Sequence, residues 1–227
     1  MTQKITEKQP SRSGRTPRFS KDVIARTAMT MIDRDGFQAF SMRSLAAELG
    51  IAVMTLYVYF PNREEILAAI GKLLLGKLGS SVEPSATWDV RVEGVVRDLY
   101  EVMQAHPGAI DIFISELSSL PASDRVTDYV RETLLGILLA NGFSVQDTTN
   151  IVSALIDFVI GHAIVQRNYE FRMRNAKSAS KSSAAARKKY PNIVKVAAKY
   201  TSRSSRTTFE FGLDILLVGL RDRYDAG

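Results

Sequence analysis

The sequence has 227 residues, 45% hydrophobic and 24% charged, with a net charge of +6; such a chain can bury a core of its own, which excludes a disordered tail and a fibre. It contains no cysteine, so a disulfide scaffold, a thiolate nucleophile and a cysteine-ligated zinc site are excluded, and we expect a cytoplasmic protein. The polar N-terminal stretch lacks the apolar run of an export signal, and no uninterrupted apolar stretch reaches the roughly 18 residues of a membrane span, so we expect no membrane partner.

Charge is distributed unevenly along the chain. Residues 1–80 carry twelve basic and seven acidic side chains, residues 81–170 carry five and thirteen, and residues 171–227 carry thirteen and four. The net charges of these parts are therefore +5, −8 and +9. A basic first third joined to an acidic middle places any polyanion-binding surface in the first third. Charge alone is equally compatible with a surface that only keeps the protein soluble.

After a basic arm over residues 1–19, which we expect to be disordered, caps and apolar spacing predict four helices, at 21–35, 42–49, 53–59 and 63–78. Ser20, Ser41 and Asn62 stand where N-caps are expected. Gly36 and Gly50 stand where helices end, and Gly50 suits the left-handed region. The second and third helices are short, and the turn between them contains a glycine.

Two short helices joined in this way are typical of a helix-turn-helix, in which the second helix enters the DNA major groove and the first crosses the backbone. A recognition helix needs only about two turns, because the groove presents only a few base pairs at once. Tyr57 and Tyr59 combine an apolar ring with a hydroxyl that reaches a phosphate oxygen. The alternative that this pattern leaves open is an ordinary hairpin of core helices with buried aromatic residues.

The stretch GSSVEPS at residues 79–85 interrupts the chain where its charge changes sign, and we place a domain boundary there, between units at 20–79 and 80–227. Further helices are predicted at 88–105, 107–118, 123–140, 144–170 and 206–223. The last two are apolar around most of their circumference, which indicates burial against both the core and a second subunit. Residues 171–206 carry eleven Lys or Arg and no acidic residue, so we expect a flexible basic segment with at most a short helix near 191–200.

The segment FSKDVIARTAMTMIDRDGFQAFSMRSLAAELGIAVMTLYVYFPNREEIL resembles the DNA-binding domain of the tetracycline-repressor (TetR) family of bacterial transcriptional regulators. The shared features are a glycine-ended first helix, Arg-x-Leu-Ala-x-x-Leu-Gly-Ile, Leu-Tyr-x-Tyr-Phe, and then a basic residue and an apolar pair. Family members are homodimers that bind a palindromic operator, and a small molecule weakens that binding. The resemblance implies an all-α fold: an N-terminal three-helix helix-turn-helix DNA-binding domain and a larger helical ligand-binding and dimerisation domain.

The same resemblance implies a set of residues that contact double-stranded DNA: Arg43, Ser44, Val53, Met54, Thr55, Tyr57, Tyr59 and Arg63. Arg43 matches a position that reads a guanine edge or a phosphate. Val53 and Met54 lie where the family makes base contacts, but both are apolar, so they either contact thymine methyl groups or pack. Arg63 matches a family lysine that anchors the DNA backbone at a helix N-terminus.

Three later segments, TWDVRVEGVVRDLYEVMQAHPGAIDIF, NGFSVQDTTNIVSALIDFVIGHAIVQ and FEFGLDILLVGL, are similar to the ligand-binding domain of the tetracycline-repressor branch itself. The magnesium ligands of that branch fall on Ile112 and Val165, which cannot coordinate a hard cation, so we expect neither a metal nor a cofactor. A pocket for a mostly apolar effector is expected from Met103, Ile112, Phe113, Leu117, Phe158 and His162. Each of these residues is also a candidate for ordinary core packing.

The function implied is that of a ligand-responsive transcriptional regulator, most simply a repressor that is released from its operator by a small molecule. The alternative is a sequence-indifferent architectural DNA-binding protein that uses the basic arm and residues 171–206. An enzyme is not expected, because His106 and His162 are far apart in the sequence and no nucleophile motif or acidic cluster accompanies them.

Overall fold

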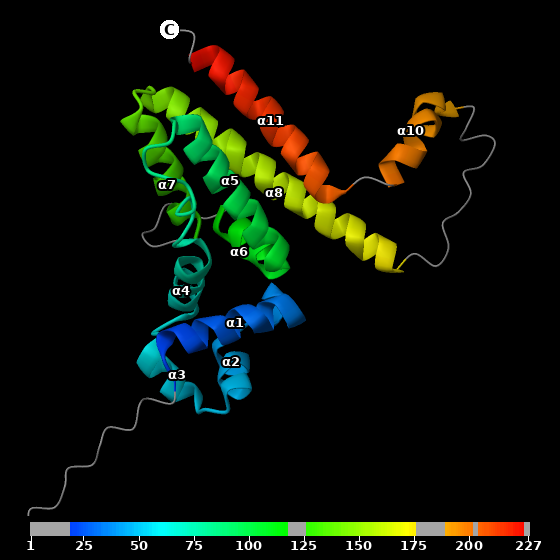
Figure 1. The fold of residues 1–227 in the computed structure, drawn as a ribbon. Helices are drawn as coiled ribbons and strands as arrows, with labels where there is room; N and C mark the ends of the chain where they lie inside the picture. The colour runs from blue at the N-terminus through cyan, green and yellow to red at the C-terminus, as the bar shows by residue number, and fades with distance from the viewer. Residues whose placement is uncertain (1–18, 118–125, 176–188, 202–203, 225–227) are drawn as a thin grey trace, which may run out of the picture.

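A computed structural model describes residues 19–117, 126–175, 189–201 and 204–224. Within these ranges the secondary structure is helical, without strands, which confirms the predicted all-α class (Figure 1). The helices are α1 (Lys21–Asp35), α2 (Met42–Leu49), α3 (Val53–Tyr59), α4 (Arg63–Leu75), α5 (Trp88–Ala105), α6 (Pro107–Leu117), α7 (Val126–Ala140), α8 (Val145–Asn175), α10 (Pro191–Thr201) and α11 (Ser205–Tyr224), with a 3₁₀ turn, η1, at Phe37–Ala39.

The first three helices begin and end at the predicted residues. Ser20 Oγ accepts the Val23 N–H at 3.2 Å, which caps α1. Gly36 ends α1, and its backbone N–H donates to the Ile32 carbonyl oxygen. Local hydrogen bonds of this kind satisfy the free backbone groups of a helix end without distant contacts. The predicted limits are therefore confirmed.

Helix α4 leads from the α1–α3 unit to the rest of the molecule and packs against α1 and α7 (Figure 1). It begins after Asn62, whose Oδ1 accepts the Glu65 N–H at 2.8 Å. It ends at Leu75, three residues before the predicted end. The chain turns over the next residues, and Gly79, at a φ of 71°, donates its N–H to Asp98 Oδ2 on α5 at 2.7 Å. This long-range hydrogen bond fixes the chain after the end of α4 against α5.

The second half of the chain is a helical bundle. Helices α5, α6, α7 and α8 pack against one another, and α11 lies along α5 and α8 (Figure 1). One cluster of buried apolar side chains extends from α1 to α11. Its members include Ile24 on α1, Ile70 on α4, Leu99 on α5 and Phe209 on α11. The division into domains at residue 80 stays a prediction.

Helix α8 is longer than expected and continues to Asn175. The prediction of a flexible segment beginning at residue 171 is therefore wrong for its first five residues. The predicted short helix near 191–200 is confirmed as α10. Residues 176–188 and 202–203 lie outside the described part. By length and composition alone, Val145–Arg172 meets the criteria for a membrane-spanning helix. Its residues Ile151, Leu155 and Val159 are buried among the other helices, as in a bundle core.

Candidate nucleic-acid interface

The turn between α2 and α3 is built from local capping and one left-handed glycine. Ser41 and Ser44 form a capping box, in which each side-chain oxygen accepts the backbone N–H of the other residue, at 3.1 and 2.9 Å. Gly50 adopts φ 66° and ψ 34°, a conformation in which a side chain costs about 1–2 kcal/mol. The N–H groups of Gly50 and Ile51 donate to the carbonyl oxygens of the last turn of α2. This turn directs α3 away from α2.

Buried side chains and one ion-pair network hold α2 and α3 on α1. Leu45 on α2 and Leu56 on α3 are fully buried. At the surface, Arg34 on α1 donates to both carboxylate oxygens of Glu48 on α2, at 2.9 and 3.0 Å. The hydrogen bonds from Arg34 lower the pKa values of Glu48 and Asp35 below their ordinary values. The end of α1 is thus tied to α2, against which α3 packs.

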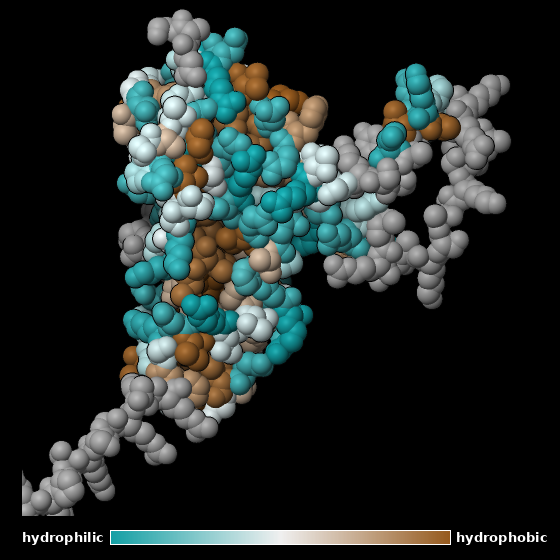
Figure 2. All heavy atoms as spheres, viewed as in Figure 1, coloured by the Kyte–Doolittle hydropathy of each residue, from teal (hydrophilic) through white to brown (hydrophobic). Residues whose placement is uncertain are grey.

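The outer face of α3 is exposed and largely apolar. Met54 is 74% exposed and Val58 is 83% exposed, and Thr55 and Tyr57 are exposed beside them. Val53 and Tyr59, on the other side, are half-buried and pack against the core. Figure 2 shows apolar surface at the end of the molecule that carries α2 and α3. The short helix therefore presents one apolar face to solvent.

The predicted DNA-contacting residues fall into an exposed group and a partly buried group. Arg43 on α2 is exposed. The Ser44 hydroxyl belongs to the capping box and lies 3.0 Å from the Ala39 carbonyl oxygen. Val58 lies outside the predicted set, although its spacing of four residues from Met54 is the signal of a shared helical face. The DNA contacts themselves stay predictions.

Arg63 turns inward, toward the η1 turn. Its guanidinium carbon lies 4.4 Å from the ring centre of Phe37 and 5.2 Å from that of Phe40. Its Nη2 donates to the Phe37 carbonyl oxygen at 3.5 Å, and its Nε is buried without a hydrogen-bond partner among the described residues. Arg63 thus joins the start of α4 to the start of η1, and its contact with a DNA phosphate stays a prediction.

The residues predicted to line an effector pocket do not gather around one cavity: some are buried in the core, and others lie between α8 and α11. Ile112 and Phe113 are buried in the core, and Leu117 ends α6 but its side chain lies outside the described part. Phe158 and His162 on α8 lie 5.4 and 5.6 Å, between ring centres, from Phe209 on α11. His162 Nε2 also lies 3.0 Å from Ser205 Oγ. The role of these residues in ligand binding stays a prediction.

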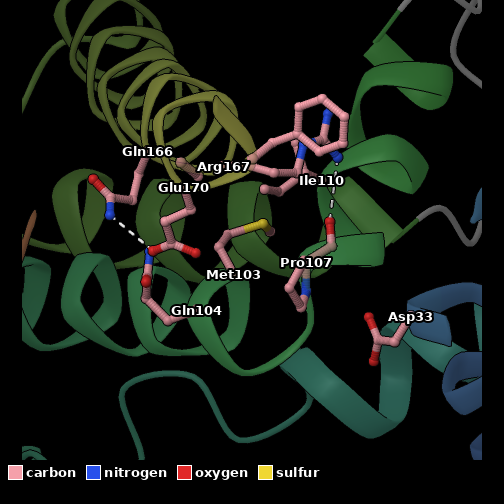
Figure 3. A pocket seen from close by; sticks show the side chains of 10 residues that line it. Asp33, Met103, Gln104, Pro107, Ile110, Gln166, Arg167 and Glu170 are labelled. Carbon is pink, nitrogen blue, oxygen red and sulfur yellow. Dashed lines mark hydrogen bonds between the residues drawn. The ribbon is translucent and has the colours of Figure 1, made fainter. Parts of the chain in front are cut away.

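A hollow of about 240 Å³ lies between the ends of α5 and α8 and the start of α6 (Figure 3). Its lining consists of Asp33, Met103, Gln104, Pro107, Ile110, Ala163, Gln166, Arg167, Glu170 and Phe171. Arg167 Nη1 donates to Asp111 Oδ1 at 2.9 Å and to the Pro107 carbonyl oxygen at 3.4 Å. Gln166 Nε2 donates to Glu170 Oε1 at 2.8 Å. Arg167, Gln166 and Glu170, the polar residues at the edge of this hollow, therefore already take part in hydrogen bonds within the protein.

A second hollow, of about 230 Å³, lies on the other side of Gln166, between α8 and the start of α11. His162 lines this hollow, whereas Met103 lines the first. The two predicted pocket residues thus line different hollows, Met103 from α5 and His162 from α8.

The hollow in Figure 3 adjoins a contact between the two halves of the chain. Asp33, at the end of α1, lies with its Oδ2 2.8 Å from His106 Nδ1. Its Oδ1 accepts the Gly108 N–H in the first turn of α6 at 2.9 Å. Such a contact joins residues more than 70 positions apart, and no signal in the sequence identified it.

Comparisons with known proteins agree with this geometry. A family model described as "Bacterial regulatory proteins, tetR family" matches residues 24–70. A second, described as "Tetracyclin repressor-like, C-terminal domain", matches residues 82–224. The boundary between the two matches lies close to the end of α4.

Individual relatives are distant but cover most of the chain. An HTH-type transcriptional regulator of Saccharopolyspora erythraea is 26% identical over 154 residues, which are 67% of this chain and 64% of that protein, so the match spans less than two thirds of the relative's length. Tetracycline repressor protein class E of Escherichia coli is 22% identical over 92% of this chain and 93% of its own. The structure of the TetR family protein ActR of Streptomyces coelicolor in complex with actinorhodin is 27% identical, with a TM-score of 0.65 over 89% of this chain and 96% of that one.

Proposed function

This chain belongs to the tetracycline-repressor (TetR) family of bacterial transcriptional regulators, and we propose that it is a ligand-responsive repressor that binds a palindromic operator as a homodimer. The observation that carries the proposal is the exposed face of α3, held by the capped α2 and its left-handed turn. A helix presented in this way enters a major groove. Since a repressor meets its operator on bacterial DNA, we place the protein in the cytoplasm.

The dimer interface is proposed on α8 and α11, which lie side by side (Figure 1). On α11, Phe211, Ile215 and Val218 are 68%, 56% and 53% exposed and are spaced four and three residues apart, so they share one face. On α8, Val165 is exposed and Gly161 leaves open space where a Cβ would lie. Two helices from each subunit would bury these faces in a four-helix bundle.

Pairing through α8 and α11 places one α3 on each side of the two-fold axis. Successive major-groove faces on one side of DNA repeat every 34–36 Å or so. The two recognition helices of a binding-competent dimer must therefore match this spacing. This requirement supports a palindromic operator, because a two-fold dimer presents the same helix to each half-site.

A small, mostly apolar effector is proposed to bind the helical half of the chain. ActR, a relative, was crystallised with actinorhodin, which shows that a fold of this kind holds a small molecule. In this chain the hollow beside Asp33 combines apolar side chains with amide and charged groups at its edge. A ligand that binds better to a dimer with the wrong α3 spacing weakens DNA binding, and DNA weakens ligand binding by the same factor.

Two structural routes support coupling between the ligand and α3. Helix α4 packs against both α1 and α7, so a tilt of α4 changes the position of the α1–α3 unit relative to the bundle. The Asp33 contact with α6 is the second route. Either route moves α3 through α1 and α2, which pack in series.

The experiment is selection of bound duplexes from a random pool by the purified protein, at about physiological salt, where non-specific contacts are screened. We expect recovery of one inverted repeat and binding of two protein chains to each duplex. Recovery of no motif, with similar affinity for all duplexes, would contradict the proposal and leave the architectural binder. A screen of small molecules for release of the recovered duplex then identifies the effector.

A further inference from the structure

We propose that Met54 and Val58 of α3 read thymine methyl groups in the major groove, so that α3 recognises its half-site by methyl contacts instead of bidentate hydrogen bonds. This inference rests on the proposed function, because it takes α3 as the recognition helix. It assigns a role to Val58, which the family resemblance did not, and it specifies which bases the half-site must contain.

Among the described residues, Met54 and Val58 on the exposed face of α3 take no part in the hydrophobic core. The core-facing side is already formed by Leu56 and Phe60, which are buried. Met54 and Val58 are four residues apart, so they lie on one face of the helix, in solvent. Adjacent exposed apolar side chains of this kind mark an interaction site. The apolar surface at this end of the molecule is visible in Figure 2.

The composition of α3 excludes bidentate hydrogen-bonded readout of bases by this helix. The helix reads VMTLYVY and contains no charged side chain and no amide. Bidentate readout of guanine requires Arg or Lys, and that of adenine requires Asn or Gln. A thioether and an isopropyl group instead match the one apolar feature of the major-groove edge, the C5-methyl group of thymine.

The spacing of the two side chains predicts the spacing of the methyl groups. Four residues of α-helix advance about 6 Å along the axis. Successive base pairs are about 3.4 Å apart. A helix lying along the groove would therefore place Met54 and Val58 over thymines about two base-pair steps apart, on either strand.

The charge around α3 favours DNA over a protein as the partner of this face. Arg43 on α2 and Lys21 on α1 are exposed, and the Lys21 ammonium lies 5.2 Å from the ring centre of Phe60, beside the end of α3. An apolar face with basic neighbours matches the methyl groups and phosphates of a duplex.

The test compares thymine with uracil, which lacks the methyl group. The inverted repeat selected from a random pool is synthesised with thymine and with single deoxyuridine replacements in each half-site. For the wild-type protein we expect affinity to fall by about fourfold for each contacted methyl group removed. The variants Met54→Ala and Val58→Ala are each expected to lose the preference for thymine at one position.

The control variant is Val145→Ala, which removes a comparably exposed side chain at the start of α8. It is expected to keep the full preference for thymine. All three variants replace exposed residues and are expected to fold like the wild type, as circular dichroism checks.

The outcomes separate this inference from the proposed function. An inverted repeat bound equally well with thymine and with uracil would overturn the inference and leave the proposed function standing. A recovered half-site without thymine on either strand would also overturn the inference and leave the proposed function standing. Recovery of no repeat would overturn both.

Discussion

Asp33 and His106 connect the end of α1 to the start of α6, with 2.8 Å between Asp33 Oδ2 and His106 Nδ1. The other carboxylate oxygen accepts the Gly108 N–H, at a helix N-terminus, where a negative charge is favoured. A Cβ on Gly108 would lie 2.6 Å from Ile32 Cγ2, so the two helices approach closely. A ligand that displaces the start of α6 must therefore also displace the end of α1.

Replacement of Asp33 tests this connection. We expect Asp33→Ala to lower the free energy of unfolding by about 1–2 kcal/mol, as for loss of a helix cap. Asp33→Asn keeps an oxygen for the Gly108 N–H and should lose less. Urea unfolding measures both. The exposed Glu132→Ala on α7 is the control, and equal stability of Asp33→Ala and wild type would show that the contact does not stabilise the fold.

The pH dependence of stability is expected to involve Asp89 on α5. Burial alone raises the pKa of Asp89, but hydrogen bonds from Thr87 and Arg221 outweigh it, and the pKa lies below its ordinary value of 3.8. A lowered carboxylate pKa contributes stability above the unfolded-state pKa, and this contribution is lost as the pH falls through the folded-state value. Wild type should exceed Asp89→Asn in stability at pH 7, and the difference should shrink below about pH 4. Urea unfolding across this range measures it, and a constant difference would contradict the assignment.

Arg63 has two separable roles. Arg63→Met keeps the aliphatic stem but removes the cation over Phe37 and Phe40, so the free energy of unfolding should fall by about 0.5–2 kcal/mol. If Arg63 also anchors a phosphate, the dependence of DNA binding on salt should decrease by about one unit of slope. Arg26→Met, an exposed arginine on α1, is the control for stability. An unchanged slope refutes the phosphate role alone.

Arg43 is exposed on α2, and its replacement should affect DNA binding without affecting folding. If Arg43 reads a guanine, Arg43→Ala should cost about 1–3 kcal/mol of operator affinity and relax the preference at one base pair. If it binds a phosphate, all sequences should be weakened and the salt slope should fall by about one unit. Titration of the operator and of single-base variants at several salt concentrations distinguishes the two. Unchanged affinity in all of them would exclude Arg43 from the interface.

Ile215 lies within the proposed dimer face of α11. Ile215→Arg would place an unpaired charge in an apolar interface, which is strongly unfavourable. We expect monomers at micromolar concentration in sedimentation equilibrium, together with loss of operator binding. Val145→Arg introduces the same charge elsewhere on α8 and should remain dimeric. An Ile215→Arg variant that stays dimeric would place the interface elsewhere.

Local signals determined the helix limits of the first 60 residues. Ser20, Gly36, Ser41 and Gly50 predicted where α1 and α2 begin and end, because each helix end is satisfied by hydrogen bonds within three to five residues of chain. The exposed apolar face of α3 follows from the same kind of periodicity, although only Met54 of its two aliphatic residues was identified beforehand. The predicted family likewise rested on a contiguous motif.

Tertiary structure alone decided the features that depend on distant residues. The inward position of Arg63, the Asp33 to His106 contact, and the separation of Met103 and His162 between two hollows each join segments far apart in the sequence. Local periodicity reports which side of a helix is apolar, but the partner of that side depends on how the helices pack. For this reason the sequence by itself determined the fold class and the helix-turn-helix, whereas the contacts that join α1 to α6 depended on the packed structure.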